Sequence, residues 1–519
     1  MRPTLNQPLK PKPGQKTRKR LAYIGHSFHL KSRSTQFLLE ALRRRFAVNS
    51  LAIDPDNLSA ADLSFTRAEC DVVVILQLDF LAPIFLARGI PTVVIPMFDG
   101  SENMPELHWQ FAQQARFVSF SRHLHVKIQR AGGTSLLVKY FPEPVADINV
   151  QKYREMSAFF WERRPDSGID AAFIARLAGS QLDRIHIHQA RDLPLPSGPD
   201  VTSLFQDTEV TTSTWFESRS DLDRLMSNYS IYFAPRLSEG IGMGFLEAMA
   251  AGMAVVANNA STHNEYIVDK VNGVLYEGHN AKALKIKPQH FVEMGQAARQ
   301  SIAEGRPIWL RQINEMLDWI DTCPAPEIGE IPPDFLDTEI CRAYSAGFGV
   351  YRNFLRRNIH LLKVLAPRME VKGSTRTTTD EESPALMPSL REPTLVFGVP
   401  ATRKYMGRGW SHDEPGYVWV DGSYATINFS AAGELTGARS LSIRCHSPPL
   451  PHPQRVAVVI NGSFAEAIEV GTDSVEHTFA LPESGLGSQT QIALYAEQTC
   501  ALPHETRRLS IAVSSISFN

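Results

Sequence analysis

The pattern of hydrophobic and polar positions changes near residue 393 of the 519-residue chain. Before that point, short apolar runs alternate with segments in which apolar residues recur with a helical period. Such runs are typical of parallel strands that helices cover on both faces. After it, short runs of alternating polar and apolar residues lie between turns rich in Gly, Pro and Ser, which predicts an all-β sandwich.

The helix-and-strand part divides into two units of similar design. Residues 20–145 form the first, and its last predicted strand runs into a segment where Pro142 and Pro144 restrict the backbone, as at a hinge. Residues 146–325 form the second, which ends in predicted closing helices over 286–321. We therefore expect two Rossmann-like α/β domains, with active residues in loops at the carboxyl ends of strands.

Four further segments complete the predicted organisation. Residues 1–19 are basic and proline-bearing, which predicts a disordered tail, and the polar stretch 372–392 predicts a linker. Residues 326–371 predict a helical extension whose apolar positions are interleaved with Arg and Lys. Such a helix can lie on an anionic membrane surface or pack on the catalytic body with its basic face in solvent. Residues 393–519 are the predicted β-sandwich accessory domain.

Aromatic residues near the start of the predicted sandwich form a weak sequence motif. The stretch G-W-S-x-x-E-P-x-x-V-W contains Trp410, Glu414 and Trp419. It resembles the opening of β-sandwich modules appended to bacterial polysaccharide enzymes. Exposed tryptophans would suit sugar stacking, but two core tryptophans that hold the sandwich together are the favoured interpretation.

Composition excludes several classes of protein. A formal net charge of −2 supplies no basic excess to neutralise nucleic-acid phosphates, so no nucleic-acid partner is expected. The five cysteines lie far apart without a C-x-x-C pair, which fits a reducing cytoplasm. The first residues lack the apolar core of a secretory signal, and no apolar run reaches spanning length. We expect a cytoplasmic protein, with peripheral association at the cytoplasmic face of the inner membrane as the alternative.

The chain is organised around residues 230–276, which predict a strand, a glycine-bearing loop, a helix and a second strand. Gly240, Gly242 and Gly244 punctuate the loop, and good helix formers follow until Gly252. The N–H groups at a helix N-terminus are unpaired and carry partial positive charge. They therefore suit an anion such as the diphosphate of a nucleotide sugar.

Two carboxylates frame this loop, Glu239 before it and Glu247 inside the helix, with seven residues between them. The stretch EGIGMGFLEAMAAG resembles the signature of family-four retaining glycosyltransferases, which have the two-domain GT-B fold. The resemblance implies that Glu239 contacts the transferred sugar, that Glu247 binds the ribose hydroxyls, and that backbone amides around Gly242–Phe245 hold the diphosphate. The alternative for Glu247 is an acid favoured only by the helix dipole. The donor-binding residues expected here are Glu247, Gly240, Gly242, Met243, Gly244 and Phe245.

Arginines take the place of a lysine that the family usually carries. Family members place Gly-Arg-Leu and then Lys-Gly after the first strand of the donor domain to clamp the diphosphate. Here Arg163 and Arg164 follow that strand, and Ser167 stands where the lysine would be. Arg236, just before the acidic loop, is a candidate replacement because Arg binds phosphate bidentately and stays protonated. The alternative for Arg163 and Arg164 is a solvated pair at a strand end.

The first unit offers His26 and Asp99 as candidate catalytic residues. The loop GHSFHLKSRS after its first strand lacks G-x-G-x-x-G, which argues against a dinucleotide-dependent oxidoreductase. His26, like His29 and Lys31, could line the interdomain cleft, although an isolated loop histidine is more often a surface or structural residue. Asp99 follows an apolar strand, at a position where the family-four glycosyltransferases that this chain resembles often carry a His or a His-Asp pair near the donor sugar. In this chain Phe98 precedes Asp99.

The resemblance to family-four glycosyltransferases implies an enzyme that moves a sugar from a nucleotide-diphosphate sugar to a saccharide or lipid-linked saccharide acceptor with retention, and we expect it to act in bacterial surface polysaccharide biosynthesis. No metal and no separate cofactor are expected, because no Asp-x-Asp motif follows a strand and backbone amides with arginines can neutralise the diphosphate. The alternatives are a catalytically lapsed protein that binds glycan or scaffolds an assembly and, less favoured, an epimerase or phosphorylase on the same fold.

Overall fold

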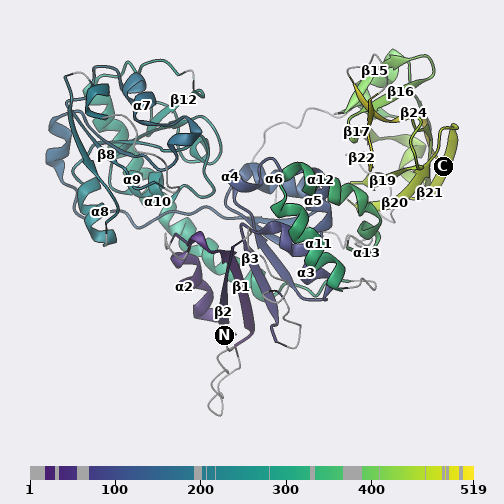
Figure 1. Cartoon of the computed structure of the whole chain (residues 1–519), viewed down its shortest axis with the longest axis horizontal. Helices are drawn as coiled ribbons and strands as arrows, with labels where there is room; N and C mark the ends of the chain where they lie inside the picture. The colour runs from purple at the N-terminus through teal and green to yellow at the C-terminus, as the bar shows by residue number, and fades with distance from the viewer. Residues whose placement is uncertain are drawn as a thin grey trace, which may run out of the picture.

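The chain forms two α/β domains, a helical extension and an all-β module (Figure 1). The predicted tail 1–19 lies outside the described residues except for 18–19, the predicted linker 372–392 lies outside them except for 388–392, and Lys31 lies outside them as well. The computed structural model describes residues 18–29, 34–54, 63, 69–191, 201–205, 207–216, 218–279, 281–327, 333–365, 388–407, 409–461, 463–481, 486, 490–501 and 507–519.

The first domain is built on a six-stranded parallel sheet in the order β2-β1-β3-β4-β5-β6. Strand β3 is buried along its whole length, which explains why its sequence is a continuous apolar run. The strands are β1 (Arg20–His26), β2 (Ala47–Ile53), β3 (Val72–Leu76), β4 (Thr92–Ile95), β5 (Arg116–Ser119) and β6 (Thr134–Leu137). The helices are α2 (Gln36–Arg45), α3 (Ala82–Ala87), α4 (Phe98–Ser101), α5 (Glu106–Phe111) and α6 (Arg122–Arg130).

The second domain repeats this design with a six-stranded parallel sheet in the order β12-β11-β10-β7-β8-β9. The prediction of two Rossmann-like domains is therefore confirmed. The strands are β7 (Ser157–Trp161), β8 (Arg184–His188), β9 (Glu209–Ser213), β10 (Ile231–Phe233), β11 (Ala254–Asn258) and β12 (Gly273–Tyr276). The helices are α7 (Ala171–Ala178), α8 (Arg219–Met226), α9 (Met243–Ala250) and α10 (Pro288–Asp321), with 3-10 turns η5 (Pro165–Ser167) and η7 (His263–Glu265).

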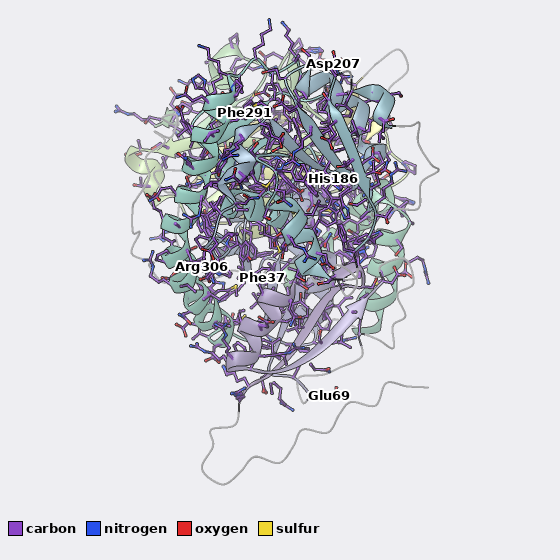
Figure 2. All side chains as sticks on the ribbon, turned by 90° about the vertical axis from the view of Figure 1, so that its left-hand side faces the viewer. Phe37, Glu69, His186, Asp207, Phe291 and Arg306 are labelled. Atoms are coloured by element: carbon purple, nitrogen blue, oxygen red, sulfur yellow. The ribbon has the colours of Figure 1, made fainter. Side chains whose placement is uncertain are left out.

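Helix α10 joins the second domain back to the first. The predicted closing helices are one continuous helix of 34 residues, although Pro307 lies inside it, so the expectation of more than one helix was wrong. Packing on the first domain compensates for the hydrogen bond that a proline removes. A Cβ at Gly305 would lie 2.2 Å from the ring of Phe141, so the glycine lets the two segments approach closely. Trp309 then packs against Phe37 of α2, with ring centroids 5.8 Å apart. Figure 2 shows Phe37 near Arg306, which belongs to the same helix α10.

The helical extension packs on the first domain. Its elements are α11 (Pro333–Ser345), α12 (Phe348–Arg357), η8 (Ile359–Leu361) and α13 (Leu362–Leu365). Tyr351 is 1% exposed, and its hydroxyl lies 2.8 Å from His108 Nδ1, whose Nε2 lies 2.9 Å from Asp79 Oδ2. Phe80 and Tyr344 stack with ring centroids 3.7 Å apart. Of the two interpretations of this segment, the structure therefore supports the packed one.

In the described part of the chain, no helix combines the length and the hydropathy that a bilayer crossing requires.

The all-β module consists of two mostly antiparallel sheets that enclose one apolar core, as predicted. One sheet has the order β13-β17-β22-β19-β20, and the other has β15-β16-β24-β18-β21 with β14 and β23 paired to β24. The strands are β13 (Ser389–Leu390), β14 (Thr394–Val396), β15 (Trp410–Glu414), β16 (Tyr417–Asp421), β17 (Tyr424–Ala431), β18 (Ser440–His446), β19 (Gln454–Ile460), β20 (Ser463–Val470), β21 (Val475–Ala480), β22 (Thr490–Ala496), β23 (Cys500–Ala501) and β24 (Arg508–Phe518).

The two motif tryptophans of the module are structural. Trp410 packs against its core and donates from Nε1 to the Thr426 carbonyl at 2.7 Å. Trp419 is 8% exposed and packs on Leu509 and Ala512. Neither ring forms an open stacking platform, in agreement with the favoured interpretation.

The module docks on the rest of the chain through an apolar face. Four buried residues of β19 and β22 belong to the same apolar cluster as the first domain and the helical extension. They are Ala457, Val459, Ala493 and Tyr495. In Figure 1 the module and the second domain lie at opposite ends of the molecule, with the first domain between them. The module is therefore remote from the contact between the two α/β domains.

Candidate functional site

The glycine loop lies between β10 and α9 and leaves the start of α9 open. Gly242 is the N-cap of this helix, has φ +80°, and offers no capping side chain. A Cβ at this position would lie 1.8 Å from the Phe245 ring, so only glycine fits. Gly242 therefore provides no capping side chain for the N–H groups of the first turn, those of Met243, Gly244 and Phe245. This arrangement suits an anion. Phe245 itself is buried, so its side chain shapes the loop from beneath.

The same loop touches the first domain. A Cβ on Gly240 would lie 2.9 Å from Met97 Sδ and 3.0 Å from Asp99 Oδ1. Arg236 Nη1 lies 2.8 Å from Asp99 Oδ2, and their side chains are 23% and 21% exposed. The structure thus brings two predicted site residues, Asp99 and Arg236, together across the domain boundary, whereas the sequence had placed them 137 positions apart without linking them.

The electrostatics of this contact depend on burial as well as on the ion pair. Burial raises the pKa of Asp99, and the guanidinium of Arg236 opposes that shift. The nearby carboxylate of Glu239 raises the same pKa further. Two carboxylates and one arginine therefore share a small, partly solvated space at the domain boundary.

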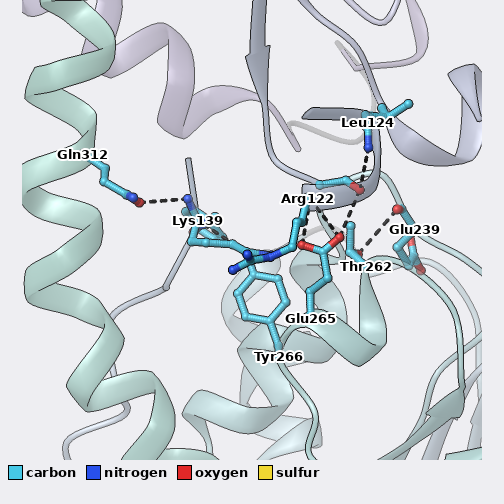
Figure 3. Close-up of polar contacts among 10 residues, drawn as sticks. Arg122, Leu124, Lys139, Glu239, Thr262, Glu265, Tyr266 and Gln312 are labelled. Atoms are coloured by element: carbon cyan, nitrogen blue, oxygen red, sulfur yellow. Dashed lines mark hydrogen bonds and ion pairs between the residues drawn. The ribbon is translucent and has the colours of Figure 1, made fainter. Parts of the chain in front are cut away.

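The two motif glutamates lie on either side of the loop. Glu239 is half-buried, and its backbone carbonyl accepts a hydrogen bond from Thr262 Oγ1 at 3.4 Å (Figure 3). Glu247 is half-buried in the second turn of α9. Glu239 lies close enough to Asp99 to raise its pKa, and the role of each glutamate stays a prediction.

Glu265 joins the two domains next to this site (Figure 3). It belongs to η7 of the second domain, and its carboxylate accepts from the backbone N–H of Arg122 at 2.9 Å through each oxygen and from Ser121 Oγ at 3.0 Å. It therefore caps the N-terminus of α6 in the first domain. The Lys139 ammonium pairs with the same carboxylate and lies 4.5 Å from the centroid of the Tyr266 ring. Burial lowers the pKa of Lys139, and Glu265 opposes that shift.

Sequence reasoning missed this contact. No motif in the sequence links Glu265 to Lys139 or Ser121. A carboxylate that caps a helix in another domain leaves no local signal, because its partners lie more than 100 positions away.

The two arginines that follow β7 have partners of their own. Arg164 forms an ion pair with Asp166 at 2.7 Å and lowers the pKa of that carboxyl. The guanidinium of Arg163 lies 5.1 Å from the centroid of the Trp161 ring. Arg236 also lowers the pKa of Asp166, which indicates that this cluster and Arg236 share one electrostatic environment.

The histidines of the first loop make local contacts. His26 Nδ1 accepts from the backbone N–H of Phe28 at 3.1 Å. His29 Nε2 lies 2.8 Å from Gln77 Oε1, and burial lowers the pKa of His29. The Asp99 carboxylate acts in the opposite direction on that pKa, so this loop faces the same space as Asp99. His26 is thus at the edge of the site, held by its own loop.

Among the residues that the structure describes, no group of three or more His, Cys, Asp or Glu side chains is placed to hold a metal ion.

Comparison with known protein families gives one match over part of the chain. Residues 207–306 match the family model described as glycosyl transferases group 1. The matched segment contains the glycine loop, α9 and both motif glutamates, and it supports a glycosyltransferase. Among curated proteins, no match was found.

Several solved structures show a distant likeness to the chain. Sucrose-phosphate synthase (tll1590) from Thermosynechococcus elongatus is 15% identical, with 58% of this chain and 100% of that chain covered and a TM-score of 0.45. Anabaena Alr3699/HepE in complex with UDP and glucose is 16% identical, with the same coverage and a TM-score of 0.42. TarM is 14% identical, with 48% and 54% covered and a TM-score of 0.36. Sequence identities and TM-scores in this range say nothing about the substrate of this chain.

Proposed function

We propose that this protein transfers a sugar from a nucleotide-diphosphate sugar to a saccharide or lipid-linked saccharide acceptor, with retention of anomeric configuration. The observation that carries the proposal is the open N-terminus of α9, which faces the first domain at Asp99 and is framed by Glu239 and Glu247. A diphosphate fits the N–H groups, and carboxylates fit sugar and ribose hydroxyls.

In this proposal the donor lies between the domains. The N–H groups of the first turn of α9 bind the diphosphate, and Arg236 contributes a cation from the strand side of the loop. Glu247 accepts hydrogen bonds from the ribose, and Glu239 contacts the transferred sugar. Asp99 and His26 face the donor sugar from the first domain. The charge that develops on the leaving diphosphate is stabilised by fixed N–H dipoles and arginine, which need no reorganisation during the reaction.

The experiment is a screen of nucleotide-diphosphate sugars for release of free nucleoside diphosphate by the full chain. Glu239→Ala should lower turnover by about 100-fold, because it removes a contact made at the reacting sugar. Glu247→Ala should weaken nucleotide binding by about tenfold, because it removes a charge-assisted acceptor. Glu293→Ala, an exposed carboxylate on α10, is the matched control.

The outcome decides between an active and a lapsed protein. Wild-type activity in both folded variants would contradict the assignment of the two glutamates. Absence of nucleotide release with every donor, together with retained nucleotide binding, would favour a lapsed protein that binds without transfer.

The arginine assignment needs its own measurement. If Arg236, Arg163 and Arg164 replace the lysine clamp, at least one Arg→Ala variant should lose about tenfold in affinity for a nucleoside diphosphate by calorimetry. Arg236→Ala should have the largest effect, because Arg236 lies directly against Asp99 at the domain boundary. Unchanged affinity in all three single variants and in the triple variant would contradict the assignment.

A further inference from the structure

A buried chain of hydrogen bonds runs from the helical extension to helix α4 of the first domain. The Tyr351 hydroxyl, on α12, lies 2.8 Å from His108 Nδ1, on α5, and His108 Nε2 lies 2.9 Å from Asp79 Oδ2. The same carboxylate oxygen accepts from Ser101 Oγ, on α4, at 2.8 Å. Asp79 begins the 3-10 turn η3 (Asp79–Leu81), which follows β3. These four side chains, called the Asp79 network below, join four elements that are separate in the sequence, of which α12 and α5 pack on each other (Figure 1).

The Asp79 network is closed to solvent and balanced in donors and acceptors. Its members are between 1% and 4% exposed. Burial raises the pKa of Tyr351, so its hydroxyl stays protonated and donates to His108. With the ring proton on Nε2, His108 donates to Asp79, so every contact joins one donor to one acceptor. Loss of one contact would leave a buried polar group without that partner, which costs more than an average hydrogen bond contributes.

Helix α4 depends on contacts of this kind. It consists of four residues, and so short a helix is not stable by itself. Three contacts hold it: Ser101 donates into the Asp79 network, the Phe98 ring lies 5.3 Å from the His123 ring, and the Glu102 carbonyl accepts from Lys127 Nζ at 2.5 Å. The contact through Ser101 joins two buried side chains, whereas His123 is exposed and Lys127 is half-buried. The Asp79 network is therefore the innermost anchor of α4.

The position of α4 in turn sets the position of Asp99, which lies two residues before Ser101 in this helix. Burial raises the pKa of Asp99, and Arg236 and the backbone N–H groups of Asp99 and Gly100 oppose that shift. The carboxylate therefore lies against the backbone of α4 and follows any displacement of the helix. It also faces the second domain, because a Cβ on Gly240 would lie 3.0 Å from Asp99 Oδ1. A shift of α4 would thus move Asp99 relative to the glycine loop.

We propose that the Asp79 network sets the place of Asp99 at the reaction centre, so that its members are positioning residues. This inference rests on the proposed glycosyl transfer, in which Asp99 faces the donor sugar. The helical extension takes part in that reaction through Tyr351, whose hydroxyl completes the network that orders α4. Reactions between held groups are sensitive to displacements of about 1 Å, so loss of one network contact lowers turnover while donor binding at α9 is kept.

The first measurement is hydrogen exchange of the α4 amides in the full chain, followed by mass spectrometry with no donor present. The amides of residues 100–102 donate within α4 and report on its opening. Ser101→Ala should speed their exchange by about fivefold, because it removes one buried hydrogen bond that holds the helix. Tyr351→Phe removes the far end of the network and should speed exchange by about twofold, since the other contacts remain.

Tyr405→Phe and Ser442→Ala are the matched controls. Both side chains are buried in the all-β module. Tyr405 Oη donates to the Ser389 carbonyl at 3.0 Å, and Ser442 Oγ lies 2.7 Å from Thr478 Oγ1. The controls remove the same chemical groups far from α4. They should lower the melting temperature by a similar amount but leave α4 exchange and turnover at wild-type values.

The second measurement is turnover in the nucleotide-release assay. Ser101→Ala should lower kcat by about tenfold and leave the affinity for nucleoside diphosphate unchanged by calorimetry, because the binding loop at α9 is untouched. In the Asp99→Asn background, Ser101→Ala should cost no further turnover, because the network acts through Asp99. A residue that only stabilised the fold would lower turnover equally in both backgrounds.

Three results would overturn the proposal. The first is wild-type exchange of the α4 amides in both Ser101→Ala and Tyr351→Phe. The second is faster exchange together with wild-type turnover, because the network would then order α4 without affecting the reaction. The third is an equal tenfold loss from Ser101→Ala in the wild-type and Asp99→Asn backgrounds. Because hydrogen exchange needs no donor, a failure of the network is distinguishable from a failure of the nucleotide-release screen.

Discussion

The first domain has two interfaces of opposite character. Toward the all-β module it shares one continuous apolar cluster, to which β19, β22 and the helical extension contribute buried side chains and the first domain itself contributes most of the rest. Toward the second domain, the contact beside the glycine loop is held by polar pairs, Arg236 with Asp99 and Glu265 with the start of α6 and Lys139. Apolar contacts on that side come from α10 and from Phe141 against Tyr266.

This difference indicates which parts of the molecule can move. An apolar interface loses its whole stabilisation when it opens, because the buried area returns to water. Polar pairs at a cleft can exchange partners for water or for a ligand at small net cost. We therefore expect the all-β module to move as one body with the first domain, and the second domain to open and close around α10. The module that follows the predicted linker is thus docked on the first domain and its helical extension.

The largest effect is expected from a charge placed in the apolar interface. Val459 is 2% exposed at this interface, and Val459→Asp would bury an unpaired carboxylate at a cost on the order of 4 kcal/mol. The module should undock, and scanning calorimetry should then show a separate unfolding transition for it. Val475→Asp, at a position 48% exposed, is the control and should leave the wild-type profile. An unaltered profile for Val459→Asp would show that the interface contributes little.

A smaller effect per substitution is expected from the buried histidines of the second domain in acid. His186, His188 and His263 are buried there, and burial lowers the pKa of each from 6.5 to about 4. Between these pH values the unfolded chain binds protons that the folded chain does not, so stability falls as the pH falls from 6.5 to 4. Above pH 6.5 these groups add no pH dependence. The free energy of unfolding changes with pH by at most about 1.4 kcal/mol per pH unit for each histidine.

Urea unfolding followed at several pH values measures this slope. His188→Asn, which keeps a hydrogen-bonding side chain, should reduce it by about a third. His412→Asn, at an exposed position in the all-β module, should not. Equal slopes in all three proteins would contradict the assignment.

The smallest effect is expected at the polar contact that Glu265 makes between the two α/β domains. Glu265→Ala removes the cap of α6 and leaves the Lys139 ammonium, 15% exposed, without its carboxylate, at a combined cost of about 2 kcal/mol. Small-angle scattering should show a more open average arrangement of the two domains. Glu143→Ala is the control, because its pair with Arg306 also joins the two domains but its side chain is 80% exposed. Indistinguishable scattering from Glu265→Ala, Glu143→Ala and wild type would show that Glu265 does not hold the closed arrangement.

Local patterns of the sequence predicted most of the fold. The apolar runs became the strands of two parallel sheets, and the change of period near residue 393 marked the all-β module. The glycine loop and the start of α9 were also predicted, because Gly242 and the helix formers after it act on neighbours a few residues away. Such local interactions are encoded by adjacent residues and can be read from them.

The sequence by itself determined the helices and strands of this protein and the glycine loop at its domain boundary. Only the tertiary structure decided that Arg236 meets Asp99, that Glu265 caps a helix of the other domain, and that α10 continues through Pro307. Each of these features depends on residues far apart in the chain. Their contact is set by how whole sheets and helices pack, and no pattern within a few residues carries that information.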